Sequence, residues 1–301
     1  MSTPKRIKIA TAQYPIDKLS DLAAARDKLT RWVTEAADSG AELLVFPEYG
    51  AMELAATAGE QVAADIPASL EAVSRALPEA DAVYADLARR HRVHILAASG
   101  PLRRADRYVN AARLITPDGR IGIQEKRIMT PFEQEWGIAS GTALRVFETA
   151  LGCIGIAICY DSEFPLLVRA QAEAGAELIL VPSCTERVSG AHRVRTAALA
   201  RALENTCAVA VSPLVGEAPW CPAVDVNTGI AGVYVPAEAG LSDTGVLAEG
   251  QLSQPGWVFA DIDLVALRAL RTCGEMRNAQ DWLLQPGASP LAQHVERVSL
   301  I

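Results

Sequence analysis

A carboxylate, an amine and a thiol each follow a short apolar or alternating run in this sequence. Glu48 comes after LLVFP, Lys126 after RIGIQE and Cys159 after IGIAI. Runs of this length and composition predict β-strands rather than helices. A carboxylate can serve as a general base, an ammonium group supplies positive charge, and a thiol becomes a nucleophile when it loses its proton. The residue types needed for nucleophilic catalysis therefore occur at three predicted strand ends.

Cys159 lies where a predicted strand gives way to a predicted helix. Residues 154–158 are largely β-branched, and Pro165 suits the first turn of a helix that Gly175 would end. Main-chain N–H groups at such a junction can face a developing oxyanion. The stretch alone fits a buried structural cysteine equally well, because free cysteine is among the most buried residue types. Glu48 and Lys126 can likewise be ordinary charged residues of solvated loops.

The composition of the whole chain restricts the class of protein. Half of the 301 residues are hydrophobic and 21% are charged, with a net charge of -8 and a pI near 5.2. Lys and Arg are scattered rather than clustered, so we expect no nucleic-acid partner. The N-terminus lacks the apolar segment of a signal peptide, and no run approaches the ~20 apolar residues of a membrane span. We therefore expect a cytoplasmic protein with no membrane partner.

The cysteine and histidine content gives little support to metal chemistry. Six Cys occur without a CxxC pair, and four His occur without metal-ligand spacing. We expect mostly free thiols in a reducing compartment, no metal site and no cofactor. A Cys-His hydrolase that uses His91, His94 or His192 is a rival arrangement, although His91 and His94 suit packing or surface roles at a strand start.

Strands and helices alternate along the chain, which predicts one α/β domain over residues 1–301. The mixture of strands, helices and a hairpin at residues 117–119 favours two packed sheets with helices outside over one doubly wound sheet. The predicted strands are residues 7–12, 43–46, 93–98, 107–115, 120–125, 154–158, 176–181, 207–212, 229–235, 245–249 and 256–262. The predicted helices are residues 17–38, 53–90 with breaks at Gly59, Pro67 and Pro78, 165–174, 192–205, and a short one capped by Asp263.

Three other segments lead to separate predictions about loops and about the C-terminal tail. Residues 213–227 contain several Pro and Gly breakers and predict a long loop, a feature that tends to be functional or mobile in compact domains. Pro131 is expected to end regular structure after Lys126. In the tail from about residue 272, Trp282 is a candidate anchor, and we expect this tail to be an oligomer or docking extension.

Three motifs, in order, resemble those of the nitrilase, or carbon-nitrogen hydrolase, superfamily. They are FPEYG around Glu48, EKRIMTPFE around Lys126 and GIAICYDSEFP around Cys159. The resemblance continues through GAELILVPS, RALEN, DIDL and DW, so it covers nearly the whole chain. It implies an α/β fold, a four-layer αββα sandwich of two mixed β-sheets with helices outside, and a Glu-Lys-Cys triad. Leu166 departs from the glutamate usual in the family, which questions a local helix contact and leaves the triad intact.

The chemistry of these residues, together with the resemblance, suggests their roles. Cys159 would attack the substrate and form a thioester, Glu48 would carry protons, and Lys126 with the Tyr160 N–H would hold the oxyanion. In amidase-like members a second glutamate follows the lysine motif; we favour Glu133, with Glu135 as the alternative. Asp161 is expected to fix its loop. The candidate substrate-binding residues are Tyr49, Trp136, Tyr160, Cys184 and Thr185, with Met52 and the loop around Trp220 as further pocket candidates.

The CYD sequence at residues 159–161 resembles amidases and carbamoylases, whereas nitrile-cleaving members usually have tryptophan and glutamate after the cysteine. We therefore predict hydrolysis of an amide or N-carbamoyl bond in a small molecule, with release of ammonia or an amine. A true nitrilase acting on a nitrile is the nearest alternative, and a non-catalytic scaffold of the same fold is an alternative of another class. Family members commonly assemble, so we expect a homodimer or larger homo-oligomer, with residues 165–174 suited to the interface.

Overall fold

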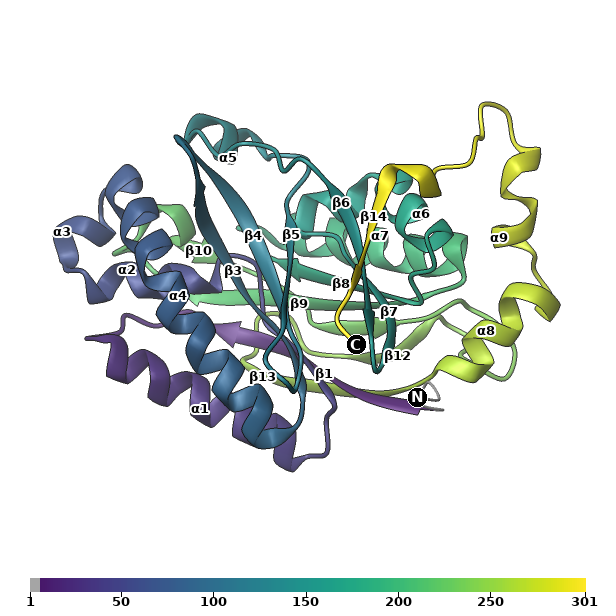
Figure 1. The fold of residues 1–301 in the computed structure, drawn as a ribbon, viewed down its shortest axis with the longest axis horizontal. Helices are drawn as coiled ribbons and strands as arrows, with labels where there is room; N and C mark the ends of the chain where they lie inside the picture. The colour runs from purple at the N-terminus through teal and green to yellow at the C-terminus, as the bar shows by residue number, and fades with distance from the viewer. Residues whose placement is uncertain (1–5) are drawn as a thin grey trace.

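In the computed structural model, which describes residues 6–301, two mixed β-sheets lie between layers of helices (Figure 1). The first sheet contains, in spatial order, β13 (Gly256–Asp263), β1 (Arg6–Pro15), β2 (Leu43–Val45), β3 (His94–Arg104), β4 (Arg107–Ile115) and β5 (Ile121–Glu125). The second contains β14 (Val295–Ser299), β6 (Leu144–Thr149), β7 (Gly152–Ile156), β8 (Leu178–Ser183), β9 (Ala208–Glu217), β11 (Gly232–Tyr234) and β12 (Val246–Glu249). The predicted fold class, an αββα sandwich, is confirmed.

The two sheets are joined and share a core. The end of β1 runs parallel to β9, where Tyr14 pairs with Leu214. In β2, Leu43 belongs to the core between the sheets, whereas Leu44 belongs to the core beneath the helices. Such a strand is buried on both faces, which accounts for its continuous apolar sequence. Polar functional side chains are therefore largely confined to the ends of the central strands.

Helices cover the outer faces of both sheets. Figure 1 shows α1 (Leu22–Asp38) and α4 (Ile66–His91) along one side of the molecule, and α6 (Pro165–Glu173) and α7 (Val188–Asn205) on the other. The Asp21 carboxylate accepts the N–H of Ala24 at 2.8 Å, so α1 begins at Leu22 rather than at residue 17. The short helices η1 (Gly50–Glu53), α2 (Leu54–Thr57) and α3 (Glu60–Ala63) connect β2 to α4. No helix within residues 6–301 combines the length and the apolar character of a membrane span.

Two of the three prolines singled out in the sequence behave differently from the prediction. Pro78 does not break its helix: it lies inside α4, which continues because Val73 and Leu77 are buried in the core beneath the helices. Pro67 marks a break between helices as predicted, because α3 ends at Ala63 and α4 begins at Ile66 with Pro67 in its first turn. Pro131 begins the helix α5 (Pro131–Glu135) instead of ending regular structure. At both of these positions the missing N–H costs nothing, because the first turn of a helix leaves its N–H groups unpaired.

The predicted long loop over residues 213–227 is wrong in its first part. β9 continues to Glu217, because the end of β1 becomes its partner where pairing with Ser183 at the end of β8 stops. A short helix, η3 (Pro222–Val224), and the strand β10 (Val226–Asn227) follow, and β10 folds back antiparallel on β9. Pairing between distant strands therefore orders a segment whose local sequence predicts a loop.

The C-terminal residues pack on the chain's own second sheet and its covering helix. Asp263 caps α8 (Leu264–Cys273), as predicted, and α9 (Asn278–Asp281), η4 (Trp282–Leu284) and η5 (Ala292–His294) lead to β14. The guanidinium of Arg169 on α6 lies 4.5 Å from the centre of the Trp282 ring. β14 pairs in parallel with β6. The tail after residue 272 is thus held by a cation–π contact and by a strand pairing within the same chain.

Candidate active site

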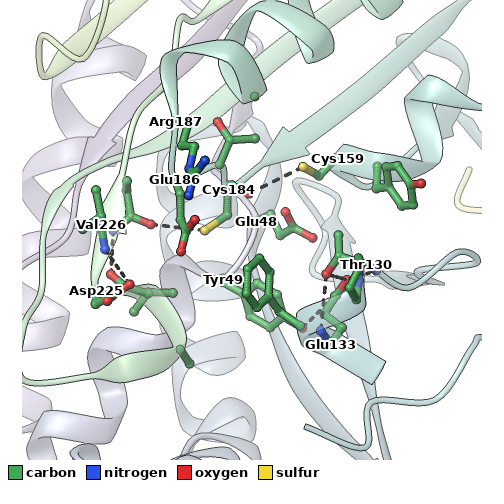
Figure 2. Close-up of a pocket in the computed structure, with 18 of the residues that line it drawn as sticks. Glu48, Tyr49, Thr130, Glu133, Cys159, Cys184, Glu186, Arg187, Asp225 and Val226 are labelled. Carbon is green, nitrogen blue, oxygen red and sulfur yellow. Dashed lines mark hydrogen bonds between the residues drawn. The ribbon is translucent and has the colours of Figure 1, made fainter. Parts of the chain in front are cut away.

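A cavity of about 870 Å³ opens near the ends of β2, β5, β7 and β8. Glu48, Lys126, Cys159 and Cys184 follow these strands and line the cavity. Figure 2 shows Glu48, Cys159 and Glu133 on one side of it and Asp225 on the opposite side. The lining includes the preferred catalytic and substrate-binding candidates from the sequence, but not Met52, Trp220 or Glu135. The candidates that line the cavity are Glu48, Tyr49, Lys126, Glu133, Trp136, Cys159, Tyr160, Cys184 and Thr185.

The chain turns sharply at Cys159. β7 ends at Ile156 rather than at residue 158, and the one-turn helix η2 (Cys159–Glu163) precedes α6. Cys159 has a φ of 46°, in the left-handed region that residues with side chains rarely adopt, and Tyr49, next to Glu48, has a φ of 53°. The Ser162 hydroxyl donates to the Cys159 carbonyl at 2.6 Å. Backbone conformations of this kind concentrate at functional sites, where the surrounding structure holds them.

Lys126 is at the centre of a group of buried charges. Its Nζ donates to Glu48 Oε1 at 2.7 Å and to Glu133 Oε2 at 2.6 Å, and none of the three side chains is more than 2% exposed. Burial would lower the pKa of Lys126, but the two carboxylates raise it above its ordinary value. An ammonium group has three N–H donors, so one is left for the cavity. Lys126 is therefore a permanent cation with a donor available to a ligand.

Glu133, and not Glu135, is brought to Lys126. Its Oε2 accepts the N–H of Thr130 at 2.9 Å, and the Thr130 hydroxyl accepts the N–H of Glu133 at 3.3 Å. This reciprocal capping box begins α5 and fixes the direction of the Glu133 side chain. The Tyr49 hydroxyl donates to Glu133 Oε1 at 2.8 Å. Glu135, on the same helix, is exposed and outside the cavity lining.

Two residues of the site, Asn110 and Ser99, were not predicted from the sequence. The Asn110 amide donates to Glu48 Oε1 at 2.9 Å and to Glu133 Oε1 at 3.1 Å, and the Ser99 hydroxyl donates to Asn110 Oδ1 at 2.7 Å. Asn110 and Ser99 are fully buried. The signal that could have identified Asn110 is its place in the apolar stretch VNAA, because a polar side chain buried there requires a partner.

The environment gives the two carboxylates different protonation behaviour. Burial, partly offset by Lys126, raises the pKa of Glu48 to about 7. Burial would also raise the pKa of Glu133, but Lys126 and the hydrogen bonds to this carboxylate hold it below its ordinary value. Burial and the charge of Glu48 raise the pKa of Cys159 well above its ordinary value. Near neutral pH, Glu133 is a fixed anion, whereas Glu48 can gain or lose a proton beside a thiol.

Short contacts join the turn at Cys159 to its surroundings. The Cys159 thiol lies 3.7 Å from the Cys184 carbonyl oxygen. A hydrogen bond between this thiol and Glu48 lowers the pKa of the Glu48 carboxyl, but by less than burial raises it. The Asp161 carboxylate accepts the N–H of Arg127 at 3.1 Å and the N–H of Ile128 at 2.8 Å. These bonds tie the turn after Lys126 to the turn that contains Cys159. They are the loop-fixing contacts expected of Asp161.

Comparison with known proteins places this arrangement in a family. Residues 8–272 match the family model described as carbon-nitrogen hydrolase. The chain belongs to the carbon-nitrogen hydrolase family. The match covers nearly all of the sequence, and the resemblance inferred from the three motifs is confirmed.

Individual relatives of this carbon-nitrogen hydrolase include amidases. The probable hydrolase YhcX of Bacillus subtilis (strain 168) is 31% identical over 276 residues, which cover 91% of this chain and 53% of that protein. The chain thus spans about half the length of YhcX. The omega-amidase NIT2 of Danio rerio is 25% identical over 276 residues, covering 88% of this chain and 91% of the relative. A mutant amidase from Nesterenkonia sp. AN1 has the same fold, with a TM-score of 0.66, 22% identity, and coverage of 93% of this chain and 96% of that one.

Aromatic side chains form part of the cavity wall of this carbon-nitrogen hydrolase. Trp136 packs edge-on against Tyr49, with ring centroids 6.3 Å apart. Tyr160 packs in the same way against Phe164, with centroids 4.8 Å apart. These contacts fix the rings in place, so the wall is formed before a ligand binds.

The opposite wall is formed by the residues after β8 and by η3 and β10. The Cys184 thiol donates to Asn227 Oδ1 at 3.2 Å, and the Thr185 hydroxyl donates to a main-chain carbonyl at 2.6 Å. Met52 does not line the cavity: it is fully buried in the core beneath the helices. Trp220 also lies outside the lining, whereas residues 222–227, which follow it, are part of the wall.

The rival Cys-His arrangement has no histidine at the cavity. His94 begins β3, and burial lowers its pKa to about 4. His91 Nε2 lies 3.4 Å from the Thr34 hydroxyl, and His192 is exposed on α7. None of these residues is part of the cavity lining. In the described part of this hydrolase, residues 6–301, no group of three or more His, Cys, Asp and Glu is arranged to hold a metal ion.

Proposed function

We propose that this chain hydrolyses the C–N bond of an amide or N-carbamoyl group in a small molecule, through a thioester on Cys159. The observation that carries the proposal is the presence of Cys159, Glu48 and Lys126 in one cavity, with the pKa of Glu48 raised by burial to about 7. A thiol, a base that exchanges protons near neutral pH and a permanent cation are the components of nucleophilic acyl transfer.

In the first half-reaction, Cys159 Sγ forms a bond to the carbonyl carbon while Glu48 takes the thiol proton. The carbonyl oxygen gains the negative charge, and the remaining N–H of Lys126 and the main-chain N–H of Tyr160 stabilise it. Removing one such donor typically costs about 3–4 kcal/mol of transition-state stabilisation. Glu48 then passes its proton to the nitrogen, the C–N bond breaks, and ammonia or an amine leaves.

In the second half-reaction, water attacks the thioester carbon and Glu48 takes a proton from it. The C–S bond breaks, the acid leaves, and Glu48 returns its proton to the sulfur of Cys159. Glu133 does not exchange protons in this scheme, because its contacts keep its pKa below the ordinary value. Its role is to hold Lys126 and to orient the substrate nitrogen or the attacking water.

The omega-amidase and amidase among the relatives support the amide alternative. The Danio rerio protein is named an omega-amidase, and the Nesterenkonia amidase carries covalent addition of the acetamide moiety of fluoroacetamide at its active site cysteine. The residues after Cys159, Tyr160 and Asp161, agree with this choice over a nitrile. Because the chain spans about half the length of YhcX, the substrate of this chain is not inferred from YhcX.

Ammonia release from a panel of amides, N-carbamoyl amines and nitriles tests the proposal. We expect turnover of at least one amide or N-carbamoyl compound, and loss of this turnover in Cys159→Ser. Ammonia release from nitriles alone would instead indicate a nitrilase. No turnover of any compound, with a Cys159 no more reactive toward iodoacetamide than the half-buried Cys153, would favour a non-catalytic scaffold.

We also propose a cytoplasmic setting and a homodimer or larger homo-oligomer. All six cysteines are free, which suits a reducing compartment. Leu166 on α6 is 58% exposed and Leu203 on α7 is 42% exposed. Exposed aliphatic side chains on two outer helices suit an interface between copies of the chain. Light scattering at micromolar concentration measures the mass in solution, and a monomer would contradict this part of the proposal.

A further inference from the structure

Asn110 lies between the two carboxylates of the site. It is on β4, fully buried, and its Nδ2 donates to Glu48 Oε1 at 2.9 Å and to Glu133 Oε1 at 3.1 Å. An amide nitrogen carries two N–H donors, so both are used. The main-chain carbonyl of Asn110 accepts the N–H of Lys126 at 2.8 Å. One residue therefore contacts Glu48, Glu133 and Lys126.

The direction of the Asn110 amide is fixed by Ser99. The Ser99 hydroxyl oxygen accepts the N–H of Tyr49 at 3.1 Å and donates its proton to Asn110 Oδ1 at 2.7 Å. Ser99 occupies an irregularity in the pairing of β3 with β4, between Ala97 and Gly100. Such irregularities redirect side chains beside functional sites. With Oδ1 bound to Ser99, the two N–H groups of Asn110 face the carboxylates, which can only accept.

The consequence concerns the two oxygens of Glu48. Oε1 accepts from both Asn110 at 2.9 Å and Lys126 at 2.7 Å, which occupies its two lone pairs. Oε2 is then the oxygen left to exchange a proton. We propose that Asn110 is a positioning residue that holds Glu48 so that Oε2 takes the proton of Cys159. This inference rests on the proposed function, because it assigns an atom to the proton transfer in that scheme.

The pH dependence of Cys159 alkylation tests this inference without knowledge of the natural substrate. The rate of modification by iodoacetamide is measured by peptide mass spectrometry for the whole protein and for Asn110→Leu. In the unchanged protein we expect the rate to rise with pH through about 7, as Glu48 ionises. Asn110→Leu removes two donors to carboxylates, so the rise should move up by about one pH unit and the rate at pH 7 should fall about fivefold.

Two further variants make the test specific. Ser99→Ala leaves Asn110 in place but removes the bond that orients it, so the rise should move in the same direction by a smaller amount. Asn205→Leu is the matched control: Asn205 is 2% exposed, and its amide donates only to the Arg201 carbonyl at 3.0 Å. A residue that merely stabilises the fold would not move the pH profile, so the Asn205→Leu profile should coincide with that of the unchanged protein.

The outcomes separate this inference from the proposed function. If Cys159 of the unchanged protein reacts no faster than the half-buried Cys153, the proposed function fails and the inference fails with it. If the unchanged protein behaves as expected and the Asn110→Leu profile coincides with it, the inference alone is overturned. If Asn110→Leu does not fold, Ser99→Ala decides: a shifted profile supports the inference and an unshifted one overturns it.

Discussion

Two clusters around a buried lysine have nearly the same composition, yet only one lies at a large cavity. The site cluster consists of Lys126, Glu48, Glu133 and Tyr49, and the outer cluster of Lys28, Glu53, Asp17 and Tyr14. In each, a lysine binds two carboxylates and a tyrosine hydroxyl donates to one of them. Burial raises the pKa of Glu48 and that of Glu53 to about 7. Composition and pKa alone therefore do not distinguish a catalytic cluster from a structural one.

The two lysines differ in how many of their N–H donors remain unused. Lys28 Nζ donates to the Pro15 carbonyl at 2.6 Å, to Asp17 at 2.7 Å and to Glu53, so its three donors are used. The space beside Glu53 is about 20 Å³, enough for about one water molecule. Lys126 keeps one donor and faces a cavity of about 870 Å³.

An ionic cluster around a buried lysine is therefore not by itself a sign of catalysis. The site cluster adds a thiol, an unused donor and room for a ligand, whereas the outer cluster ties η1 to β1 and α1. Four comparisons, three of them pairs of variants and one a pH profile, set each part of the site cluster against a matched residue elsewhere in the chain.

Replacing each lysine by methionine should separate the clusters most strongly. Lys126→Met should lower kcat at least about 10³-fold, because the cation that holds Glu48 and the oxyanion is lost. Lys28→Met should leave kcat nearly unchanged but destabilise the protein by about 3–5 kcal/mol, because it leaves a buried carboxylate unpaired. Ammonia release and urea unfolding measure the two effects. A folded Lys28→Met protein with an equal loss of activity would contradict the distinction between the clusters.

The two neighbouring glutamates of α5 provide the next comparison. Glu133→Gln should lower kcat about 10²-fold, because Lys126 loses one of its two carboxylate partners in a buried site. Glu135→Gln changes an exposed side chain outside the cavity and should leave kcat within about twofold. Steady-state kinetics with the same amide measures both. Equal effects at the two positions would show that Glu133 acts through the helix rather than through Lys126.

The pH dependence of activity distinguishes Glu48 from Glu53, although both have a pKa of about 7. Glu48 can take the thiol proton only when it is ionised, so kcat/KM should rise with pH through about 7 and then level off. Below this rise the rate should fall about tenfold per pH unit. Glu53→Gln should leave the profile in place. A profile that moves with Glu53→Gln would assign the titration to the outer cluster.

The two tyrosines should give the smallest effects. Tyr49→Phe removes a hydrogen bond of 2.8 Å to Glu133, and kcat should fall about five- to tenfold, since bonds to charged groups contribute about 1.5–3 kcal/mol and the other contacts of Glu133 remain. Tyr14→Phe removes a bond of 3.1 Å to Glu53 and should affect only unfolding. Measured kcat and urea midpoints compare the two. A fall in kcat for Tyr14→Phe but not for Tyr49→Phe would show that the Tyr49 hydroxyl has no part in the reaction.

The features that sequence could predict are those set by local pattern and by motif. Cys159, Lys126 and Glu48 stand next to short predicted strands, and the resemblance of the three motifs to one family predicts that they share a site. The sequence favours Glu133 over Glu135 but does not decide between them, because the decision depends on the capping box with Thr130 and on the direction that α5 takes.

The features that sequence could not predict depend on contacts between distant segments. Asn110 and Ser99 meet only because β3 and β4 pair with an irregularity near Ser99. β9 extends beyond Ser212 because the end of β1 becomes its partner, and α4 passes through Pro78 because its neighbours pack on the sheet. In each case tertiary contacts outweigh the local preference that the prediction used.

The claim that Cys159 carries a thioester can be tested directly by stopping the reaction in acid during turnover of an amide that releases ammonia. Mass spectrometry of the peptides then locates any acyl group. We expect the acyl group on the peptide that contains Cys159, its removal by hydroxylamine, and its absence from Cys159→Ser. Full turnover by Cys159→Ser, or an acyl group on a different residue, would contradict the proposed nucleophile.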